Sequence, residues 1–368
     1  MSTFHVLIKR IKSVEKHPNA DRLEIVRVDG YECIVKRDEY RPSDLVAYIP
    51  EQAIIPEWLL TRLGFAWDHE KNKGPLHGKN GDRVKAIKLR GVLSQGLCVP
   101  VIQDSYTTGT IMTGKDPLAF ASVSEGDDVT EILGITKYEE PVPVAMSGEV
   151  FNAGTHLTVA FDVENWKSCP DVFAEGDEVI FTEKLHGTFT GIAILPIKDA
   201  HPEAFGKYRN ILIFSKGLGA KGFVFKNNER NKNNVYVRST DLLVKTIDAL
   251  DFEGVPLFIL GETYGPGVQD LSYGTTLGFR VFAVANGYRY LDQNEINSVA
   301  DLFGFETVPV LYQGPFSIEK MREFTDGKTA LDADHIREGI VISRPTPTAF
   351  IKSVSADYLM RKGGTEFN

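Results

Sequence analysis

The sequence predicts an α+β protein in which a small β-barrel precedes a larger, strand-rich domain. At 368 residues with 42% hydrophobic content, the chain is long enough for two domains with sizeable cores. Short apolar runs separated by turn residues fill the first 140 residues, and this spacing is typical of a barrel. From about residue 156, strands mix with a few helical patterns, which favours α+β over a doubly wound sheet.

The first domain is predicted from apolar runs that end at turn residues such as Asp29-Gly30. The expected strands are His5–Ile11, Leu23–Val28, Cys33–Val35 and Leu45–Ile49. The stretch Lys16–Leu23 resembles the opening of the tRNA-binding barrel that is appended to some aminoacyl-tRNA synthetases. This resemblance favours an OB-type barrel, a fold that often holds oligonucleotides. The basic residues between Lys79 and Arg90 would suit the binding of an oligonucleotide, although a solvated barrel face explains this cluster equally well.

Domain boundaries follow from a proline-containing run, Tyr138–Val144. Proline blocks regular hydrogen bonding, so this run is expected to be extended. We predict an OB-like nucleic-acid-binding domain over residues 1–140, a linker over 141–155 and a second domain over 156–368. Helical patterns in the second domain cover Ser239–Leu250, Asn294–Phe303 and Ser317–Phe324.

Charge and cysteine content limit the classes of function. The net charge of −9 argues against binding to nucleic acid through the overall field, yet residues 201–245 carry nine Lys/Arg against three acids. Such a local surface binds phosphates, or is simply a solvated loop. The separated cysteines Cys33, Cys98 and Cys169 fit neither a disulfide framework nor a zinc site. With no membrane-spanning run and no signal peptide, we expect a cytoplasmic protein without a membrane partner.

Lys184 stands on a tight connection between two expected strands. Val179–Phe181 leads into this connection and Phe189–Ile194 leads out of it, with Gly187 between. A lysine beside a glycine can meet a phosphate closely, and desolvation or nearby cations lower its pKa enough to make it a nucleophile. The alternative is an exposed lysine on a hairpin.

Four further strands carry side chains that suit a nucleotide. These are Glu262 at the end of one strand, Phe282 within a second, Glu338 at the head of a third and Lys352 inside a fourth. A phenylalanine ring can stack on a base. A lysine inside an apolar strand is unusual, because an unpaired buried ammonium is costly. Ordinary roles are the alternatives: Glu262 could cap a turn, and Phe282 could be core.

In this order the elements resemble the covalent nucleotidyltransferase superfamily of ATP-dependent ligases and capping enzymes. The resemblance covers residues 156–368. It includes a Lys-x-x-Gly motif at Lys184 and a Ser-Lys-Gly element at 215–217, followed by the four strands above. It implies a nucleotidyltransferase domain of antiparallel sheets with flanking helices.

Two features resemble the RNA ligases within this superfamily. His186 stands where DNA ligases and capping enzymes usually carry aspartate, as in nick-sealing RNA ligases. Only a short stretch follows Lys352, so we expect no C-terminal OB domain of the kind those other enzymes use. A barrel before the transferase domain is similar to RNA ligases known from Deinococcus and the protist Naegleria.

The resemblance implies a role for each site residue. Lys184 would attack the α-phosphorus of ATP, His186 would serve the later transfer of AMP to a 5′-phosphate, and Lys352 would stabilise the phosphates. Nucleotide contacts would come from Glu183, Lys216, Glu262 at the ribose, Phe282 at the adenine and Lys352, and Glu338 would hold Mg²⁺ or Mn²⁺. The alternative for His186 is a purely structural histidine whose ring nitrogens are hydrogen-bonded within the fold.

The expected function is an ATP-dependent RNA ligase that joins 3′-hydroxyl and 5′-phosphate ends, through lysyl-AMP and AMP-capped intermediates, at nicks in duplexes. Its expected partner is RNA or an RNA-containing nicked duplex. The alternatives are a DNA ligase or capping-type transferase and, from another class, a non-catalytic RNA-binding protein. Ala283 and Phe350 depart from the family pattern, because relatives often carry aspartate and a second lysine there.

Overall fold

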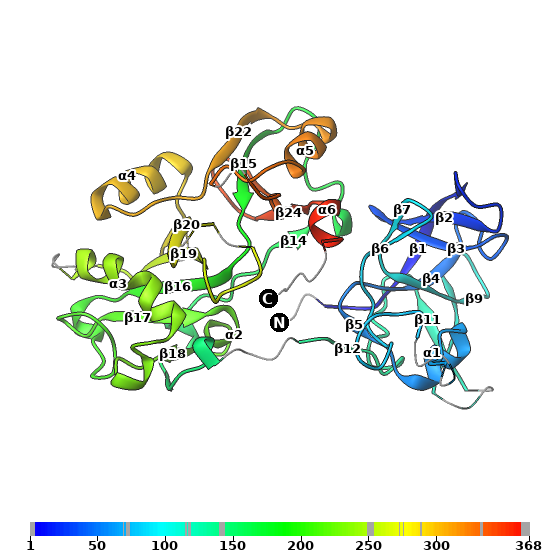
Figure 1. Cartoon of the computed structure of the whole chain (residues 1–368), viewed down its shortest axis with the longest axis horizontal. Coiled ribbons are helices and arrows are strands. Elements are labelled where there is room, and N and C mark those ends of the chain that lie inside the picture. Colours follow the sequence, from blue (N-terminus) through cyan, green and yellow to red (C-terminus); the bar gives the residue numbers. More distant parts are fainter. Residues whose placement is uncertain are drawn as a thin grey trace. The chain divides into compact units, whose positions relative to one another are not determined.

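The chain folds into two units (Figure 1). A computed structural model describes residues 4–68, 70, 74–114, 116, 119–139, 144–248, 254–271, 273–274, 276–287, 289–331 and 334–361. One unit comprises Met1–Glu139 and Trp166–Val172, and the other comprises Glu140–Asn165 and Phe173–Asn368. Residues 140–143 of the expected linker region lie outside the described residues. Both units are rich in strands with few helices, as the predicted α+β class requires.

A five-stranded antiparallel sheet forms the centre of the first unit. Its strand order is β3-β2-β1-β4-β8. The strands are β1 (Leu7–Lys16), β2 (Leu23–Val28), β3 (Tyr31–Lys36), β4 (Leu45–Ile49) and β8 (Leu97–Pro100). Strand β1 pairs with β4 through its first half and with β2 through its second half, and its register with β2 shifts between Ile11 and Ser13. Such a bulge bends the strand and increases its twist, so the sheet curls.

Strand β4 lies at the centre of the barrel core. All five of its residues are buried. Leu45, Ala47 and Ile49 pack into one hydrophobic cluster, whereas Val46 and Tyr48 pack into another. This alternation follows from the period of two in a strand that is covered on both faces. Shorter elements complete the unit: β5 (Ala53–Ile54), α1 (Glu57–Leu63), β6 (Ile87–Leu89), β7 (Val92–Ser94), β9 (Ile102–Gln103), β10 (Thr108–Met112), β11 (Phe120–Ser124) and β12 (Thr136–Lys137).

A short segment that is distant in sequence, Trp166–Val172, packs with the first unit. The backbone N–H of Gly30 donates to the carbonyl of Lys167 at 2.8 Å, and the hydroxyls of Tyr31 and Ser168 lie 2.9 Å apart. A Cβ at Gly30 would lie 2.7 Å from the Lys167 Cα, so only glycine fits this contact. The domain boundaries expected from the sequence stay a prediction. They gave no indication that Trp166–Val172 would pack with the first unit.

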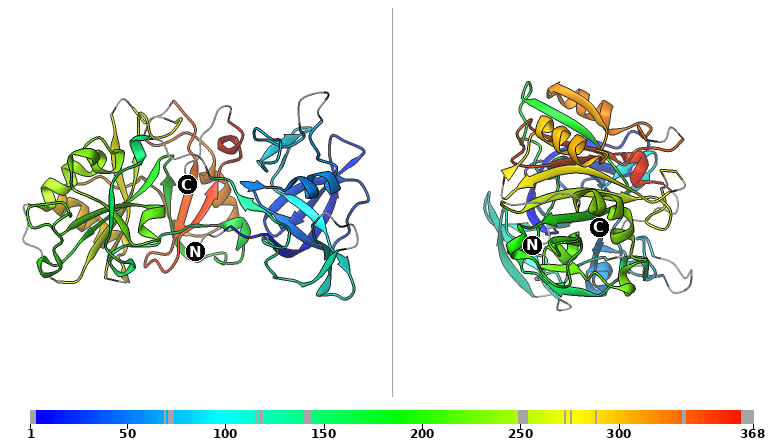
Figure 2. Two further views of the ribbon diagram at one scale, coloured as in Figure 1. Left: turned by 90° about the horizontal axis from the view of Figure 1, so that it is seen from below. Right: turned by 90° about the vertical axis from the view of Figure 1, so that its left-hand side faces the viewer.

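Two five-stranded sheets form the second unit (Figure 2). The first has the order β14-β24-β23-β15-β22 and the second β17-β16-β19-β20-β21. The strands of the first are β14 (Glu164–Asn165), β15 (Glu178–Lys184), β22 (Val310–Pro315), β23 (Gly339–Ser343) and β24 (Ile351–Val354). Those of the second are β16 (Thr188–Ile194), β17 (Ile211–Ser215), β19 (Leu257–Tyr264), β20 (Gly278–Asn286) and β21 (Arg289–Tyr290). Neighbours are antiparallel except β14 and β24, which are parallel.

The connection that carries Lys184 passes from one sheet to the other. A hairpin would pair β15 with β16, but β15 pairs with β22 and β23, and β16 with β17 and β19. Three residues, 185–187, therefore join the two sheets. Gly187 is required there, since a Cβ would lie 2.2 Å from the Thr263 carbonyl oxygen. Lys184 is thus fixed where the sheets meet.

Helices pack on one face of the second sheet. Side chains of α3 (Val235–Ile247) and α4 (Gln293–Phe303) share a hydrophobic cluster with Ile192 and Ile259. Helix α4 begins one residue before its predicted start because Asp292 and Glu295 form a capping box. Helix α3 begins four residues early because the Asn234 side chain accepts from the Tyr236 N–H. The last predicted positions of α3, residues 249–250, lie outside the described residues.

The remaining elements of the second unit are short. They are β13 (Val150–Asn152), α2 (Lys216–Gly219), β18 (Phe223–Phe225), α5 (Ile318–Thr325) and α6 (Ala356–Leu359), with 3₁₀ turns between them. Within the part of the chain that the structure describes, no helix combines the length and apolarity needed to cross a membrane.

Candidate active site

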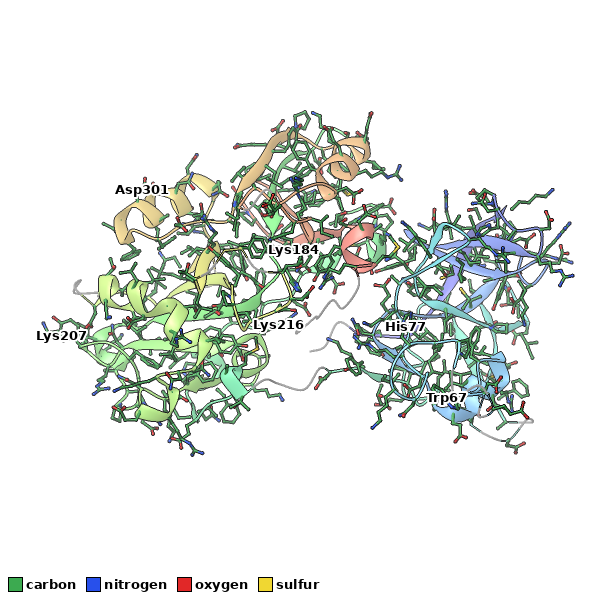
Figure 3. The ribbon with its side chains drawn as sticks, viewed as in Figure 1. Trp67, His77, Lys184, Lys207, Lys216 and Asp301 are labelled. Carbon is green, nitrogen blue, oxygen red and sulfur yellow. The ribbon has the colours of Figure 1, made fainter. Side chains whose placement is uncertain are left out.

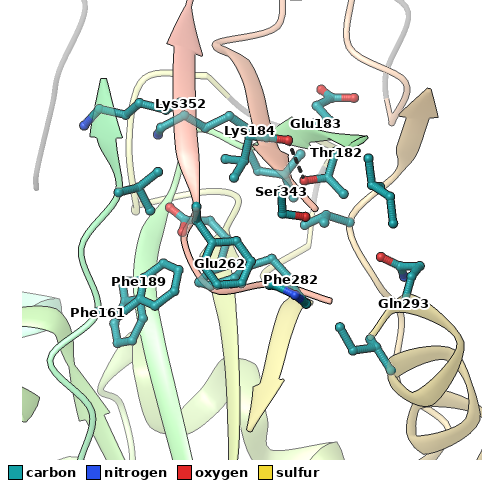
Figure 4. Close-up of a pocket in the computed structure, with 18 of the residues that line it drawn as sticks. Phe161, Thr182, Glu183, Lys184, Phe189, Glu262, Phe282, Gln293, Ser343 and Lys352 are labelled. Atoms are coloured by element: carbon teal, nitrogen blue, oxygen red, sulfur yellow. Dashed lines mark hydrogen bonds between the residues drawn. The ribbon is translucent and has the colours of Figure 1, made fainter. Parts of the chain in front are cut away.

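Residues of both sheets of the second unit line one pocket (Figure 4). Six of the eight predicted site residues line it: Glu183, Lys184, Lys216, Glu262, Phe282 and Lys352. The other two, His186 and Glu338, are buried beside Lys184. The structure therefore brings together side chains from four strands, one helix and two connecting segments that are far apart in sequence.

Lys184 and Glu338 form a close ion pair. Lys184 Nζ lies 2.5 Å from Glu338 Oε1, and the two side chains are 20% and 7% exposed. Burial raises the pKa of Glu338, but the charge of Lys184 and the neighbouring His186 outweigh it and hold this pKa at about 2. Glu338 is therefore a carboxylate at neutral pH, and it holds the lysine at the junction of the sheets.

Two more lysines point toward the same region. Lys352 lies opposite Val341 within the first sheet. Burial, followed by the charges of Lys184 and Lys216, lowers the pKa of Lys352 to about 8. Lys216, the first residue of α2, reaches Asp162 Oδ1 at 3.1 Å. In Figure 4 the chains of Lys184 and Lys352 end on the same side of the pocket. A polyanion such as a triphosphate would relieve the repulsion among these cations.

Glu262 is on β19, and in the view of Figure 4 it lies below Lys184 and Lys352. Burial raises its pKa to about 8, because the opposing effects of Lys184 and Lys216 are smaller and Glu338 repels the charged form. At neutral pH this carboxyl group is mostly protonated, so it can both donate and accept a hydrogen bond. That capacity suits the hydroxyl groups of a ribose.

Aromatic rings form the other end of the pocket. Phe282 is half-buried, and its ring centroid lies 5.1 Å from that of Phe161 and 6.1 Å from that of Phe189. Phe350 adds a fourth ring at 5.3 Å from Phe161. The departure at Phe350 therefore extends an aromatic wall. Ala283 is 1% exposed and does not line the pocket, so that departure lies in the core.

Glu183 is almost fully buried, at 2% exposure. Its Oε2 accepts from the Ala330 N–H at 2.8 Å, whereas Oε1 has no hydrogen-bond partner among the described residues. Figure 4 shows the carboxyl group directed away from the aromatic rings. The predicted contact between Glu183 and the nucleotide stays a prediction.

His186 has polar neighbours that sequence analysis missed. Its Nδ1 lies 2.6 Å from the Tyr358 hydroxyl and its Nε2 lies 2.7 Å from Asp270 Oδ1. Nδ1 is also 3.7 Å from Glu338 Oε2. Asp270 follows β19 in irregular chain and Tyr358 lies on the four-residue helix α6. Neither stands in a motif, so no sequence signal marked them.

A divalent metal would be held jointly with a nucleotide. Among the described residues, no three or more histidine, cysteine, aspartate or glutamate side chains gather in a way that could bind a metal. Glu338 is nevertheless a carboxylate at neutral pH, and it lies beside Lys184 at the charged end of the pocket. Mg²⁺ is often bound by one or two carboxylates together with substrate phosphates. The donor set therefore fits such a metal.

Five of the nine basic residues in region 201–245 form ion pairs with acids. The pairs are Lys216–Asp162, Lys226–Glu203, Arg230–Glu149, Lys232–Glu229 and Lys245–Asp241, with N–O distances between 2.5 and 3.1 Å. Of its basic residues, Lys216 lines the pocket. Figure 3 shows Lys207 at an edge of the second unit, away from Lys184 and Lys216. The charge excess thus does not form one phosphate-binding surface.

Comparisons with known proteins agree with this geometry. Residues 177–355 match the RNA ligase family, and residues 5–101 match an OB-fold domain family. Naegleria gruberi RNA ligase with PPi is similar over 97% of this chain and 98% of its own, with 24% identity and a TM-score of 0.75. A lysine-to-alanine mutant of that enzyme with ATP and Mn is similar over 96% of this chain and 98% of its own, with 24% identity and a TM-score of 0.74. No curated protein matches the chain.

These matches confirm two predictions. The fold is α+β, with an OB-type barrel before a nucleotidyltransferase domain. The second domain is an RNA ligase domain, which confirms the predicted class of enzyme.

Proposed function

We propose that the RNA ligase domain at residues 177–355 uses ATP, that Lys184 is its nucleophile, and that it seals nicks in RNA-containing duplexes. The observation that carries this proposal is the ion pair between Lys184 and Glu338, at the charged end of a pocket whose other end is aromatic. A nucleoside triphosphate has the same division, because its base is apolar and its phosphates are anionic.

The first step is transfer of AMP to Lys184. The Lys184 ammonium first gives up a proton to solvent, and Glu338 Oε1, 2.5 Å away, holds the nitrogen in place. The nitrogen then attacks the α-phosphorus, a P–N bond forms, the bond to the bridging oxygen breaks, and pyrophosphate leaves. Lys352 and Lys216 stabilise the negative charge that builds on the phosphate oxygens.

The rest of the pocket orients the nucleotide. Phe282 stacks on the adenine, Glu262 bonds the ribose, and Glu183 contacts the nucleotide through its buried carboxyl group. Mg²⁺ or Mn²⁺, held by Glu338 and the phosphates, supplies further charge neutralisation when bound. The similar Naegleria gruberi RNA ligase structures with ATP and Mn, or with AMP and Mn, support this assignment.

The later steps join RNA. AMP passes from Lys184 to an RNA 5′-phosphate with the help of His186, and a 3′-hydroxyl then attacks and releases AMP. The histidine in the Lys-x-His-Gly motif supports a nicked duplex as substrate. The barrel contributes basic residues such as Lys88 and Arg90 for the RNA backbone. Three cysteines that form no disulfide bond, Cys33, Cys98 and Cys169, support a reducing, cytoplasmic setting.

Labelling with α-³²P-ATP tests the nucleophile. We expect label on the denatured wild-type chain and on the control Lys198→Ala, whose lysine is exposed. We expect none on Lys184→Ala. A folded wild-type protein that takes up no label would overturn the proposal.

Substrate choice needs a second assay. Nicked duplexes with RNA or DNA on the 3′-hydroxyl side are compared with single-stranded RNA of the same sequence. Faster sealing of the RNA nick supports the proposal, and equal sealing of single strands would contradict it.

A further inference from the structure

His186 is held by a set of side chains from two distant parts of the chain, and we call it the histidine clamp: Asp270, Tyr358 and Arg361. His186 is 1% exposed. Asp270 Oδ1 and the Tyr358 hydroxyl contact its two ring nitrogens at 2.7 and 2.6 Å. The His186 backbone N–H also donates to the Tyr273 hydroxyl at 2.7 Å. Both the ring and its backbone are therefore fixed.

Arg361 holds the other two members of the clamp. Its Nε and Nη2 donate to the two carboxylate oxygens of Asp270 at 2.8 and 3.0 Å, a bidentate arrangement. Its Nη1 donates to the Tyr358 carbonyl at 2.7 Å, and its guanidinium carbon lies 3.7 Å above the Tyr358 ring. Asp270 and Tyr358 thus keep fixed positions relative to the imidazole.

The hydrogen-bond partners assign the tautomer of a neutral His186. A carboxylate oxygen of Asp270 can only accept, so Nε2 carries the hydrogen. Nδ1 is then free to accept from the Tyr358 hydroxyl. The ring edge that carries Nδ1 is the one near Glu338, 3.7 Å from Oε2.

The histidine clamp holds His186 beside Glu338, and the surroundings of Glu338 change once Lys184 has been adenylated. Lys184 is held directly by Glu338, so adenylation does not depend on the ring. Once Lys184 carries AMP, its nitrogen is uncharged and the ion pair with Glu338 is lost. Among these side chains, His186 then remains as the close polar neighbour of Glu338.

We propose that Asp270, Tyr358 and Arg361 are positioning residues that fix His186 for transfer of AMP to the RNA 5′-phosphate. This inference rests on the proposed function, since it concerns the second step of that reaction. The three residues act through His186 and need not touch the substrate.

The test separates the two steps. Lysyl-AMP enzyme is prepared, freed of ATP and mixed with a nicked duplex that carries a labelled 5′-phosphate, and AMP transfer is followed in a single turnover. Adenylation is measured separately with α-³²P-ATP. Asp270→Asn should slow AMP transfer about 10- to 100-fold, because a charge-assisted hydrogen bond is lost. Its adenylation rate should fall less than about threefold, since the direct Lys184–Glu338 pair remains.

Tyr358→Phe is the milder variant, because it keeps the ring and removes one hydroxyl group. We expect transfer to slow about 3- to 10-fold, the effect of one neutral hydrogen bond. Asp301→Asn, at an exposed position, and Tyr208→Phe, at a half-buried one, lie outside the pocket and are matched controls that should behave as wild type. In a His186→Ala background, Asp270→Asn should add less than about twofold, since both act through one ring.

Two results would overturn this inference. One is equal slowing of both steps by Asp270→Asn and Tyr358→Phe, which indicates a structural role only. The other is a full additional effect of Asp270→Asn without His186. A wild-type chain that never forms lysyl-AMP would remove the proposed function as well, so the two failures are distinguishable.

Discussion

The charged and aromatic ends of the pocket differ in what they contribute to the stability of the empty protein. At the charged end, burial lowers the pKa of Lys352 and raises that of Glu262, so both groups resist ionisation there. At the aromatic end, Phe161, Phe189 and Phe282 pack ring against ring. The charged end thus prepares the pocket for the ligand but destabilises the folded protein. The aromatic end both contacts the ligand and stabilises the fold.

Replacing Lys352 should have the largest effect and should separate activity from stability. Lys352→Met should slow lysyl-AMP formation about 100- to 1000-fold, as loss of a charge-stabilising group does. The free energy of unfolding should nevertheless rise by about 1 kcal/mol, because a buried cation near two others is removed. Adenylation rates and urea melts measure the two quantities, with Lys198→Met as control. A clear loss of stability would contradict the comparison.

Replacing Phe282 tests the aromatic end. Phe282→Leu should raise the KM for ATP about 10-fold, since base stacking contributes roughly 1–3 kcal/mol. Unlike the lysine variant, it should also lower the free energy of unfolding, by about 1 kcal/mol. The measurements are the same two. An unchanged KM would mean that the adenine lies elsewhere.

The pH dependence sharpens the contrast further. Lys352 loses its proton above about pH 8, so binding of pyrophosphate should weaken between pH 8 and 9. The unfolded chain keeps that proton up to the ordinary lysine pKa of roughly 10.4, so it binds more protons than the folded protein in this interval. The contribution of Lys352 to stability therefore rises with pH there. Calorimetric titration should show weakening in the wild type and a flatter profile in Lys352→Met.

Surface cations should matter least. Lys226→Ala and Arg230→Ala remove charges that are already paired with Glu203 and Glu149. Exposed pairs contribute about 0.2–1 kcal/mol, so adenylation should change less than about twofold. A tenfold loss in the adenylation rate would show that these paired cations take part in the reaction after all.

The sequence was most informative where local order carried the signal. Lys184, Glu262 and Lys352 could be predicted because each lies on an apolar strand, and their order along the chain matched a known arrangement. The helical pattern of Asn294–Phe303 predicted helix α4 to within one residue of its start. The basic region 201–245 was less informative, since a local count of charges omits acids from elsewhere in the chain, such as Asp162 and Glu149, that pair with its cations.

Contacts that are remote along the chain could not be predicted. His186 meets Asp270 and Tyr358 across 84 and 172 positions. Neither partner belongs to a periodic segment, so nothing local marks it. The passage from β15 to β16 between two sheets is equally non-local, because strand pairing decides it.

The segment Trp166–Val172 has a consequence for dissecting this protein. It follows β14 and precedes β15 of the ligase domain, yet its contacts at Gly30 and Tyr31 belong to the barrel. A single cut between the expected domains therefore leaves each fragment incomplete. A barrel ending near residue 139 lacks a piece of its own surface, and a ligase domain beginning near 156 carries that piece without its support. Domain exchange between relatives would succeed only if this segment travels with the barrel it fits.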